Sequence, residues 1–418
     1  MTKRLILAFV FLSWHLVACS NGDSGISSGL PDKPSAEEDS PGTETISEEM
    51  RVKITGEDLY ISAKLDAKTD ILYWFKKCMF NELFTFYRVG TIDNNMPAPA
   101  TLPDASPTSL LNLAYSDNIG PFNITGYGWC GGNHPYLDEV TQTARNIGYR
   151  IYIDGKEIKT DLSTLTKEIK IEVINEIMNP SKADTSSGKT LLNEILCIET
   201  VNYSIYRNNI QVLVTHEFQN ESPVTLQMYY GMQSMFDKET HTLTANGKYV
   251  DWTVQKDVST FTKKEYPSFR RFIEKSANVY QSSYLFADGL GNHEEISDDD
   301  IIFIGNSSNK TYHKIIADRE HKKGDIIHWS GVYTWFKSPV SDDDDLLCYE
   351  GVIDNKKVLF IDCKKSVDRT IQLPVNYTKK SFTIIEKSKS ITITGNKVTA
   401  KGLKIVSDGS GSCVITFD

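Results

Sequence analysis

The chain has no run of basic residues. It carries 45 lysines and arginines against 55 aspartates and glutamates over 418 residues, a formal net charge of −10. A chain of this sign repels phosphate backbones and anionic lipid headgroups. We therefore expect no nucleic acid among its partners and no charge-driven attachment to an anionic lipid surface.

Signature motifs of catalysis are also absent. The sequence has no nucleophile elbow, no phosphate-binding glycine loop and no His-Glu-x-x-His element. Beyond the first twenty residues, no segment is apolar enough to cross a membrane as a helix. Paired carboxylates for glycoside cleavage cannot be recognised in one sequence, because their separation is set by the fold. Whether the protein is an enzyme therefore stays open, with the absence of motifs favouring a non-catalytic role.

The first nineteen residues have the form of a secretory signal. Lys3 and Arg4 precede a largely apolar stretch from Leu5 to Ala18, which ends at Cys19. A basic start, a short apolar middle and a small-residue cleavage site make up such a signal. With a cysteine at the cut, residues 1–18 resemble a bacterial lipoprotein signal peptide. The resemblance implies cleavage before Cys19, acylation of Cys19 (palmitate among the acyl groups) and anchoring to membrane lipid. The alternative is an ordinary secretory signal with an incidental cysteine.

Residues 19–50 are rich in serine, glycine, proline and acidic residues. Such a segment buries too little apolar surface to offset the entropy of ordering, so we expect a disordered acidic stalk. Ser20, rather than Asp, follows Cys19, which in lipoproteins implies the outer membrane. The stalk resembles those of Bacteroidetes lipoproteins that reach the outer leaflet. Localisation is therefore expected to be outer-membrane and lipid-anchored, on the periplasmic or cell-surface side. Removal of Lys3 and Arg4 with the signal takes the formal charge from −10 to −12.

Of the seven cysteines, six lie beyond Cys19. One pair can be argued from strand register. If Asn355-Lys356 forms a two-residue hairpin turn, Cys348 and Cys363 lie directly opposite each other, within reach of a disulfide. The alternative is that the two are small buried side chains without a bond.

Period-two alternation of apolar and polar residues dominates the chain beyond the stalk, and it is typical of half-buried strands. Asp154-Gly155 and Asn208-Asn209 are expected hairpin turns. Helical evidence is confined to Leu165–Met178, which fits either period, and to Pro267–Val279. We expect a mainly β protein with few short helices. A large antiparallel β-sandwich over residues 51–336 precedes a smaller C-terminal β-sandwich over residues 337–418.

These two regions resemble parts of carbohydrate-associated proteins. Residues 51–336 resemble the mutarotase-like β-sandwiches in a general way, and the closing strands resemble the β-domain that ends many carbohydrate-active enzymes. The resemblance implies a sugar-related function. Mutarotase-like catalysts pair a histidine with a carboxylate, whereas alternation here places His216 and Glu217 on opposite faces of one strand. His216 is expected in the core and Glu217 on the more polar face.

A glycine-rich loop over residues 126–136 carries the expected ligand site. Its glycines allow close approach of a ligand, while its aromatic and polar side chains suit the faces and hydroxyls of a sugar. The expected ligand-binding residues are Tyr127, Trp129, Asn133, His134 and Tyr136. The alternative is a loop that plugs the end of the sandwich, with Trp129 in the core. Cys130 and His134 alone do not make a metal site.

Other candidate residues are weaker. The residues considered for acid or base catalysis are Glu217, His134, Asp288 and Glu294. The acidic segments at 298–300 and 342–345 could contact calcium, but neither has the spacing of a calcium-binding loop. No cofactor is predicted. The leading hypothesis is a surface lipoprotein that binds glycan. The alternatives are a polysaccharide-acting enzyme (hydrolase, lyase or epimerase) and a structural envelope lipoprotein.

Overall fold

A computed structural model describes residues 46–101, 111–114, 120–235, 241–243, 249–251, 259–261, 271–276, 278–286, 302–305 and 310–417. The chain divides into two compact units at residue 44, and all described residues belong to the unit Thr45–Asp418. The expected signal peptide, Cys19 and most of the expected stalk lie outside the described residues. The same holds for Asp288 and Glu294.

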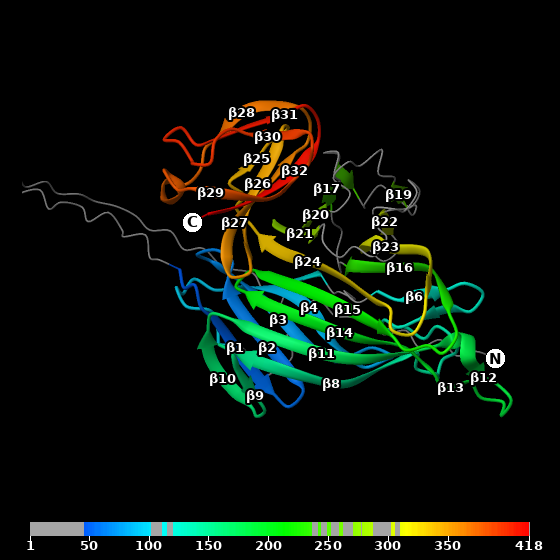
Figure 1. The fold of residues 1–418 in the computed structure, drawn as a ribbon. Helices are drawn as coiled ribbons and strands as arrows, with labels where there is room; N and C mark the ends of the chain where they lie inside the picture. The colour runs from blue at the N-terminus through cyan, green and yellow to red at the C-terminus, as the bar shows by residue number, and fades with distance from the viewer. Residues whose placement is uncertain are drawn as a thin grey trace, which may run out of the picture. The chain divides into compact units, whose positions relative to one another are not determined.

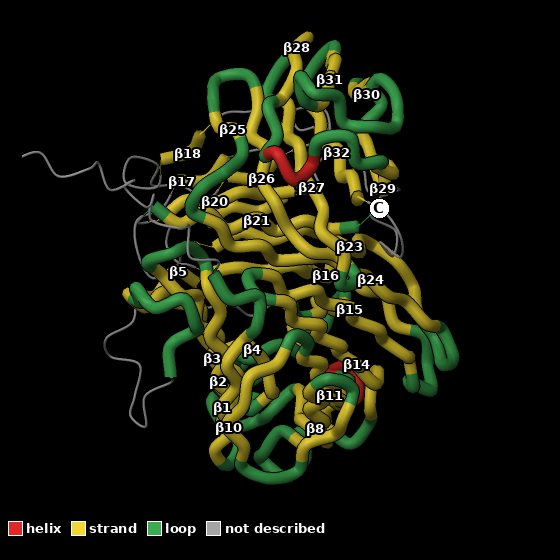
Figure 2. Tube along the Cα trace, turned by 90° about the vertical axis from the view of Figure 1, so that its left-hand side faces the viewer, coloured by secondary structure: helices red, strands yellow, loops and turns green. Residues whose placement is uncertain are grey.

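The described part of the chain is mainly antiparallel β-structure, as expected (Figures 1 and 2). Its helical segments are the short 3₁₀ turns η1 (Pro180–Lys182) and η4 (Val375–Tyr377). Neither is long and apolar enough to span a membrane. The helical reading of Leu165–Met178 is wrong, because its inward side chains alternate in β11 (Ile169–Met178). The helical reading of Pro267–Val279 is wrong over β20 (Arg271–Ser276).

A ten-stranded antiparallel sheet is the centre of the large sandwich, and its strands β8, β11, β14 and β15 run side by side in Figure 1. Its strands, in spatial order, are β18 (Tyr249–Asp251), β17 (His241–Leu243), β20, β21 (Val279–Leu285), β24 (Ile326–Phe336), β15 (Asn209–Phe218), β14 (Ile195–Tyr206), β11, β8 (Ala144–Ile153) and β9 (Lys156–Ile158).

Two six-stranded sheets accompany it. The N-terminal sheet has the order β10 (Leu162–Thr166), β1 (Met50–Thr55), β2 (Asp58–Lys64), β3 (Thr69–Cys78), β4 (Leu83–Asp93), β5 (Leu111–Ala114). The β16 sheet has the order β19 (Ser259–Phe261), β22 (Ile302–Gly305), β23 (Lys310–His321), β16 (Val224–Met235), β6 (Phe122–Ile124), β7 (Gly128–Cys130). A two-stranded sheet joins β12 (Ala183–Asp184) to β13 (Leu191–Leu192).

Both six-stranded sheets pack on the same face of the ten-stranded sheet. Tyr203 of β14 contacts Phe75 and Phe86 of the N-terminal sheet. His216 of β15 contacts Phe122 of the β16 sheet at a ring-centroid distance of 4.8 Å. Tyr203 pairs with Val212, so it shares a face with His216, two strand periods further along β15. One continuous hydrophobic core therefore spans all three sheets.

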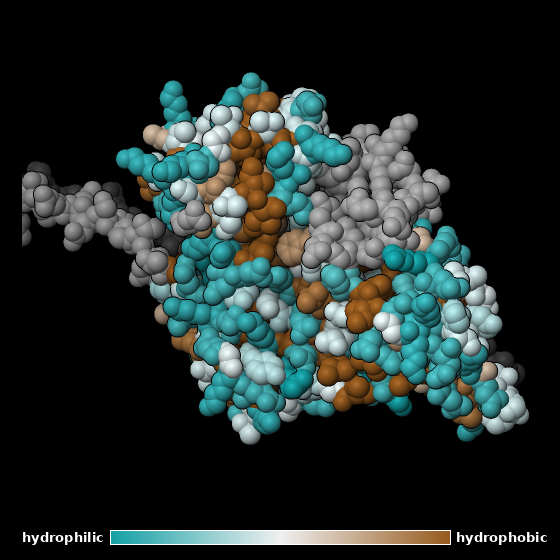
Figure 3. Space-filling view, in the orientation of Figure 1, coloured by the Kyte–Doolittle hydropathy of each residue, from teal (hydrophilic) through white to brown (hydrophobic). Residues whose placement is uncertain are grey.

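The outer face of the ten-stranded sheet is mixed in character. Glu217 is exposed there, as alternation predicted, and Leu213 and Ile326 add exposed apolar side chains. In Figure 3, brown hydrophobic areas interrupt the hydrophilic surface over these strands.

The C-terminal region forms the smaller sandwich. Its five-stranded sheet has the order β25 (Ser341–Asp342), β26 (Leu346–Ile353), β27 (Lys356–Cys363), β32 (Gly411–Phe417), β29 (Phe382–Lys387). Its three-stranded sheet has the order β28 (Val367–Ile371), β31 (Leu403–Ser407), β30 (Ile391–Ile393). The five-stranded sheet buries both faces. Cys348 and Ile361 belong to the small core, whereas Tyr349 and Phe360 share a cluster with Tyr284 and Phe336 of the ten-stranded sheet.

Two hairpin turns fall one residue earlier than expected. Tyr206 pairs with Asn209, so the first turn is Arg207-Asn208. Ile353 pairs with Lys356, so the second is Asp354-Asn355. Both central residues of the second turn have positive φ, 49° and 59°, which a twisted two-residue hairpin favours.

Of the two alternatives for Cys348 and Cys363, the register contradicts the disulfide and supports two buried side chains without a bond. Cys348 lies opposite Ile361, and Cys363 lies opposite Leu346, so the two cysteines are two positions out of register. Diagonal neighbours of this kind are farther apart than directly opposite residues. Cys348 is a buried free thiol, and burial raises its pKa further above the usual range.

A buried polar network crosses the core beneath His216, which is a hydrogen-bonded core histidine as expected. His216 Nε2 lies 2.9 Å from Glu199 Oε2, and both side chains are fully buried. Asn175 donates to the other carboxylate oxygen at 2.9 Å, and Asn146 donates to Asn175. Each added donor reduces the cost of burying the Glu199 carboxylate.

A second buried histidine, His321, makes the stability of the fold depend on pH. Its ring stacks on the ring of Phe218, with the two ring centroids 4.4 Å apart. Burial, followed by the nearby positive charge of Arg319, lowers the pKa of His321 from 6.5 to about 4. The imidazole of His321 takes up a proton near pH 6.5 in the unfolded chain but only near pH 4 in the folded chain. The stability that the neutral ring contributes is therefore fully present above pH 6.5 and declines as the pH falls toward 4.

We expect His321→Phe, which keeps an aromatic ring on Phe218, to lose less stability than the unsubstituted protein between pH 7 and pH 5. Over this pH range, the loss in the free energy of unfolding should be about 1–2 kcal/mol smaller for His321→Phe. Urea unfolding at the two pH values measures it. His328→Phe, at an exposed position of β24, should behave as the unsubstituted protein. Equal losses in His321→Phe and the unsubstituted protein would contradict the assignment.

Candidate functional site

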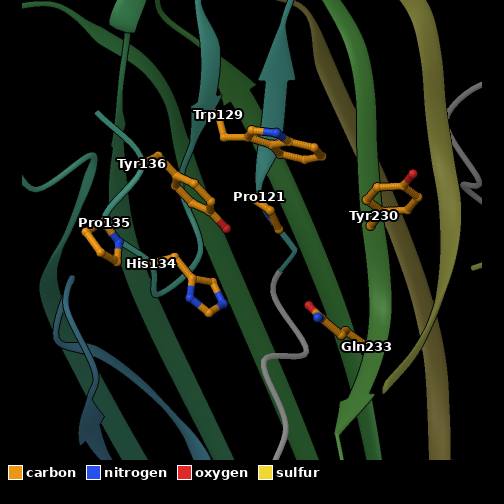
Figure 4. A pocket seen from close by; sticks show the side chains of 7 residues that line it. All are labelled: Pro121, Trp129, His134, Pro135, Tyr136, Tyr230 and Gln233. Carbon is orange, nitrogen blue, oxygen red and sulfur yellow. The ribbon is translucent and has the colours of Figure 1, made fainter. Parts of the chain in front are cut away.

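A pocket of about 410 Å³ opens beside the β6–β7 hairpin (Figure 4). Its volume lies within the range of small-molecule sites. The pocket is lined by Pro121, Trp129, His134, Pro135, Tyr136, Tyr230 and Gln233. Figure 4 shows two walls, one from β7 and the segment that follows it, and the other from β16, with Pro121 between them. We call it the Trp129 pocket.

Buried contacts fix the loop that carries the first wall. After β7 the chain turns inward at Gly131, whose φ is 77°, a conformation that glycine adopts without strain. Asn81 donates to the carbonyl of Gly132 at 2.7 Å, and the carbonyl of Asn133 accepts from Phe80 at 3.3 Å. The loop is thus tied to the β3–β4 turn, which leaves His134 and Tyr136 beside the pocket.

Irregular pairing of β16 produces the second wall. Its register to β23 shifts between Tyr229 and Tyr230 and again between Gly231 and Ser234. Bulges of this kind redirect side chains that regular alternation would bury or expose. Tyr230 and Gln233 face the pocket as a result (Figure 4).

Close backbone packing holds the two walls together at Gly120. A Cβ built on Gly120 would lie 1.5 Å from the carbonyl oxygen of Tyr230, so no side chain fits there. Gly120 therefore sets the approach of Pro121 to Tyr230 across the pocket.

The aromatic rings of the pocket are close to parallel. Trp129 lies 6.1 Å from Tyr230 with an interplanar angle of 18°, and 6.2 Å from Tyr136 with an angle of 29°. His134 meets Tyr136 edge-on at 5.7 Å. Parallel ring faces pack against flat apolar surfaces such as the C–H faces of a pyranose, while the His134, Gln233 and tyrosine polar groups suit hydroxyls.

The pocket carries little charge. No carboxylate, lysine or arginine stands among its described lining residues. Cys130, beside Trp129, is fully buried, and burial raises the pKa of its thiol, so it is a poor metal ligand or nucleophile. Over the described residues, no cluster of three or more histidine, cysteine or acidic side chains is arranged to hold a metal ion.

The residues singled out from the sequence separate into distinct places. Trp129, His134 and Tyr136 line the pocket, and Trp129 is half-buried rather than part of the core. Tyr127 is exposed on the hairpin turn, away from the lining. Asn133 is buried, with its carboxamide oxygen accepting from the backbone of Leu83, so it supports the loop. Glu217 lies outside the pocket, and Asp288 and Glu294 lie outside the described residues.

Sequence reasoning missed Tyr230, Gln233 and Pro121. Tyr230 falls in a run that alternates as an ordinary strand, so its position depends on bulges that the pattern does not announce. The available signal in the sequence is Gly231, because a glycine within a strand pattern indicates a bulge or a close backbone approach. In the structure, a Cβ added to Gly231 would lie 2.4 Å from Ile315 Cδ1.

The acidic segment 342–345 is engaged within the protein. Asp343 accepts from Arg369 Nη1 at 2.6 Å, Lys364 pairs with Asp342, and Lys365 pairs with Asp345. Burial works against ionisation of Asp343, but the Asp345 backbone N–H and Arg369 outweigh it and lower its pKa to about 2. Its charge therefore stabilises the small sandwich.

No protein-family model and no curated protein matches this chain. Solved structures give weak similarities. A GH36 α-galactosidase from Geobacillus stearothermophilus aligns at 7% identity and a TM-score of 0.39, over 69% of this chain and 41% of that chain. A polysaccharide lyase aligns at 7% identity and 0.26, over 82% and 45%. An α-mannosidase from Enterococcus faecalis aligns at 8% identity and 0.28, over 88% and 51%.

These similar proteins are carbohydrate-active by their descriptions, and this chain spans about half of their length or less. At TM-scores below 0.5 they support no argument about fold or activity. The site itself must carry the function.

The contact at Gly120 gives a direct test of how the pocket is built. Gly120→Ala should force the backbone of Tyr230 away and destabilise the protein by about 2 kcal/mol or more. Gly148→Ala, with no atom within 4 Å of the added Cβ, should stay within about 0.5 kcal/mol of the unsubstituted protein. Guanidinium unfolding compares the two. Equal stability of both variants would refute the close packing.

Proposed function

We propose that the protein binds carbohydrate in the Trp129 pocket. The observation that carries the proposal is the set of near-parallel rings of Trp129, Tyr136 and Tyr230 lining a 410 Å³ pocket. A hexose presents apolar C–H faces and a rim of hydroxyls. The rings would pack on the faces, and His134 and Gln233 would bind the rim.

The lack of carboxyl groups in the described lining of the pocket favours binding over catalysis. Glycoside cleavage requires two carboxyl groups on either side of the scissile bond. The described lining contains aromatic, proline, histidine and glutamine side chains instead. Of the sequence candidates for acid–base work, His134 lines the pocket, whereas Glu217 stands on the outer face of β15 and is not part of the lining. The polysaccharide-acting enzyme is thus the second hypothesis.

We further propose that the binding unit is held at a membrane by an acylated Cys19. The proposal rests on Lys3, Arg4, the apolar stretch to Ala18 and the acidic stalk that follows. A flexible stalk would let the pocket reach glycan away from the lipid surface.

The pocket proposal predicts a loss of glycan binding from single ring removals. Trp129→Ala and Tyr230→Ala should each weaken binding of a glycan found by array screening at least tenfold, about 1.4 kcal/mol, because each removes a stacking face. Isothermal titration measures the affinity.

Two matched variants serve as controls. Tyr127→Ala removes an exposed tyrosine of the same hairpin that does not line the pocket, and Glu217→Gln alters an exposed carboxylate of β15. Both should bind as the unsubstituted protein does. Unchanged affinity in Trp129→Ala and Tyr230→Ala would sink the site. If the unsubstituted protein turns over the glycan and Glu217→Gln does not, that result would favour the enzyme hypothesis.

The anchoring proposal predicts acyl labelling at one residue. Grown with an alkyne analogue of palmitate, bacterial cells producing the full chain should label the protein, and Cys19→Ala should remove the label and release the protein from the membrane fraction. Persistent labelling of Cys19→Ala, or none in the unsubstituted chain, would refute acylation of Cys19.

A further inference from the structure

A second cavity of about 340 Å³ lies between the large and small sandwiches, within the same compact unit. Its walls are the Arg207-Asn208 turn of β14–β15, the connection that follows β24, and part of the β26–β27 hairpin. The charged side chains among its lining are Arg207, Lys337, Lys357 and Glu350. We call it the Arg207 cavity. Cavities at such junctions are common places for small ligands.

Three of these four charges have close partners. Lys337 pairs with Asp66 at 3.0 Å, and Lys357 pairs with Glu48 at 2.9 Å. Glu350 accepts from the hydroxyl of Tyr377 at 2.6 Å.

Arg207 is different. Its Nη1 is 3.9 Å from Glu48 Oε1, and its buried Nε has no hydrogen-bond partner among the described residues. Burial places Nε out of reach of a ligand, but the side chain is 25% exposed and the contact of Nη1 with Glu48 is long, so the Nη groups have capacity for an anion.

The backbone of Arg207 is strained as well. Its φ is 50°, at a turn position where glycine, asparagine or aspartate is usual. Neighbours hold the residue there: its N–H donates to Met50 Sδ, and its carbonyl accepts from the Tyr73 hydroxyl at 3.0 Å. Strain maintained by surrounding contacts at a cavity wall is typical of functional positions.

We infer that the Arg207 cavity binds the oxyanion of a small molecule, with a carboxylate accepting from the Nη groups of Arg207. The two Nη groups present parallel N–H donors at the end of the guanidinium, which match two carboxylate oxygens. Glu48, close to Lys357, shows that a carboxylate is accommodated beside these cations. This site is separate from the Trp129 pocket, which has no cationic arginine or lysine in its lining.

The experiment uses thermal unfolding of the protein from residue 19 onward, with glucuronate, glucose or sulfate. Glucuronate carries a carboxylate on a sugar, glucose is its neutral match, and sulfate is an inorganic oxyanion. In Trp129→Ala, which removes a stacking face of the other pocket, glucuronate should raise the Tm in a saturable way and glucose should not. A matching rise with sulfate would assign recognition to the oxyanion alone, and no rise with sulfate would assign it to the sugar carboxylate.

Arg207→Gly removes the guanidinium and relieves the positive φ. It should melt at or above the Tm of the unsubstituted protein in buffer and, combined with Trp129→Ala, lose the response to glucuronate. Lys379→Gly is the matched control, because Lys379 is an exposed cation at φ 68° outside the cavity lining. It should keep the full response, as should Trp129→Ala, which separates this site from the Trp129 pocket.

Three results would overturn the inference. They are no saturable response in Trp129→Ala, the same response when Arg207→Gly is combined with Trp129→Ala, and a Tm of Arg207→Gly well below that of the unsubstituted protein in buffer. The last would make Arg207 a purely structural residue.

Discussion

Burial of one face of the ten-stranded sheet is the constraint on which the rest of the structure depends. Along β14 and β15, inward side chains must fit the N-terminal sheet at one end and the β16 sheet at the other. Tyr203 meets Phe75, and His216 meets Phe122 and Tyr229. A slip of one residue in this pairing would turn every inward side chain outward. Because Phe122 and Tyr229 adjoin Pro121 and Tyr230, the same packing that fixes the core also fixes the two walls of the Trp129 pocket.

Polar groups inside this core are tolerated where they are connected. Glu199 is fully buried, but His216 and Asn175 occupy both of its oxygens. Lys64 and Asp70 form another fully buried pair at 2.9 Å, with Asn94 joining from the segment that follows β4. Buried ion pairs add little net stability, since desolvation offsets attraction. Their consequence is specificity: a misregistered sheet would strand these charges without partners.

The sequence predicts the strands well because their signal is local. Of the five residues predicted to bind a ligand, Trp129, His134 and Tyr136 line a pocket, whereas Tyr127 and Asn133 do not. Alternation identified the β-structure and placed His216 inward and Glu217 outward. It failed where backbone geometry decides. Arg207 and Asp354 adopt positive φ, which moves both hairpin turns one residue earlier and takes Cys348 out of line with Cys363. Tyr230 entered the pocket through bulges in β16, which depend on contacts with β23 and β6 that no local pattern encodes.

The two cavities differ in the interactions that would bind a ligand. The Trp129 pocket offers ring faces and neutral polar groups, so its affinity would come from apolar contact and hydrogen bonds, with little dependence on salt. The Arg207 cavity offers a guanidinium within a protein whose net charge is −10. At physiological ionic strength, charges are screened beyond about 8 Å, so the overall repulsion of an anion is weak at distance and Arg207 dominates at contact. In the two proposals, a neutral sugar and an oxyanion would therefore be selected by separate places on one fold. A ligand that carries both groups would bind through only one of them in either cavity, because neither cavity alone presents both the parallel rings and the guanidinium of Arg207.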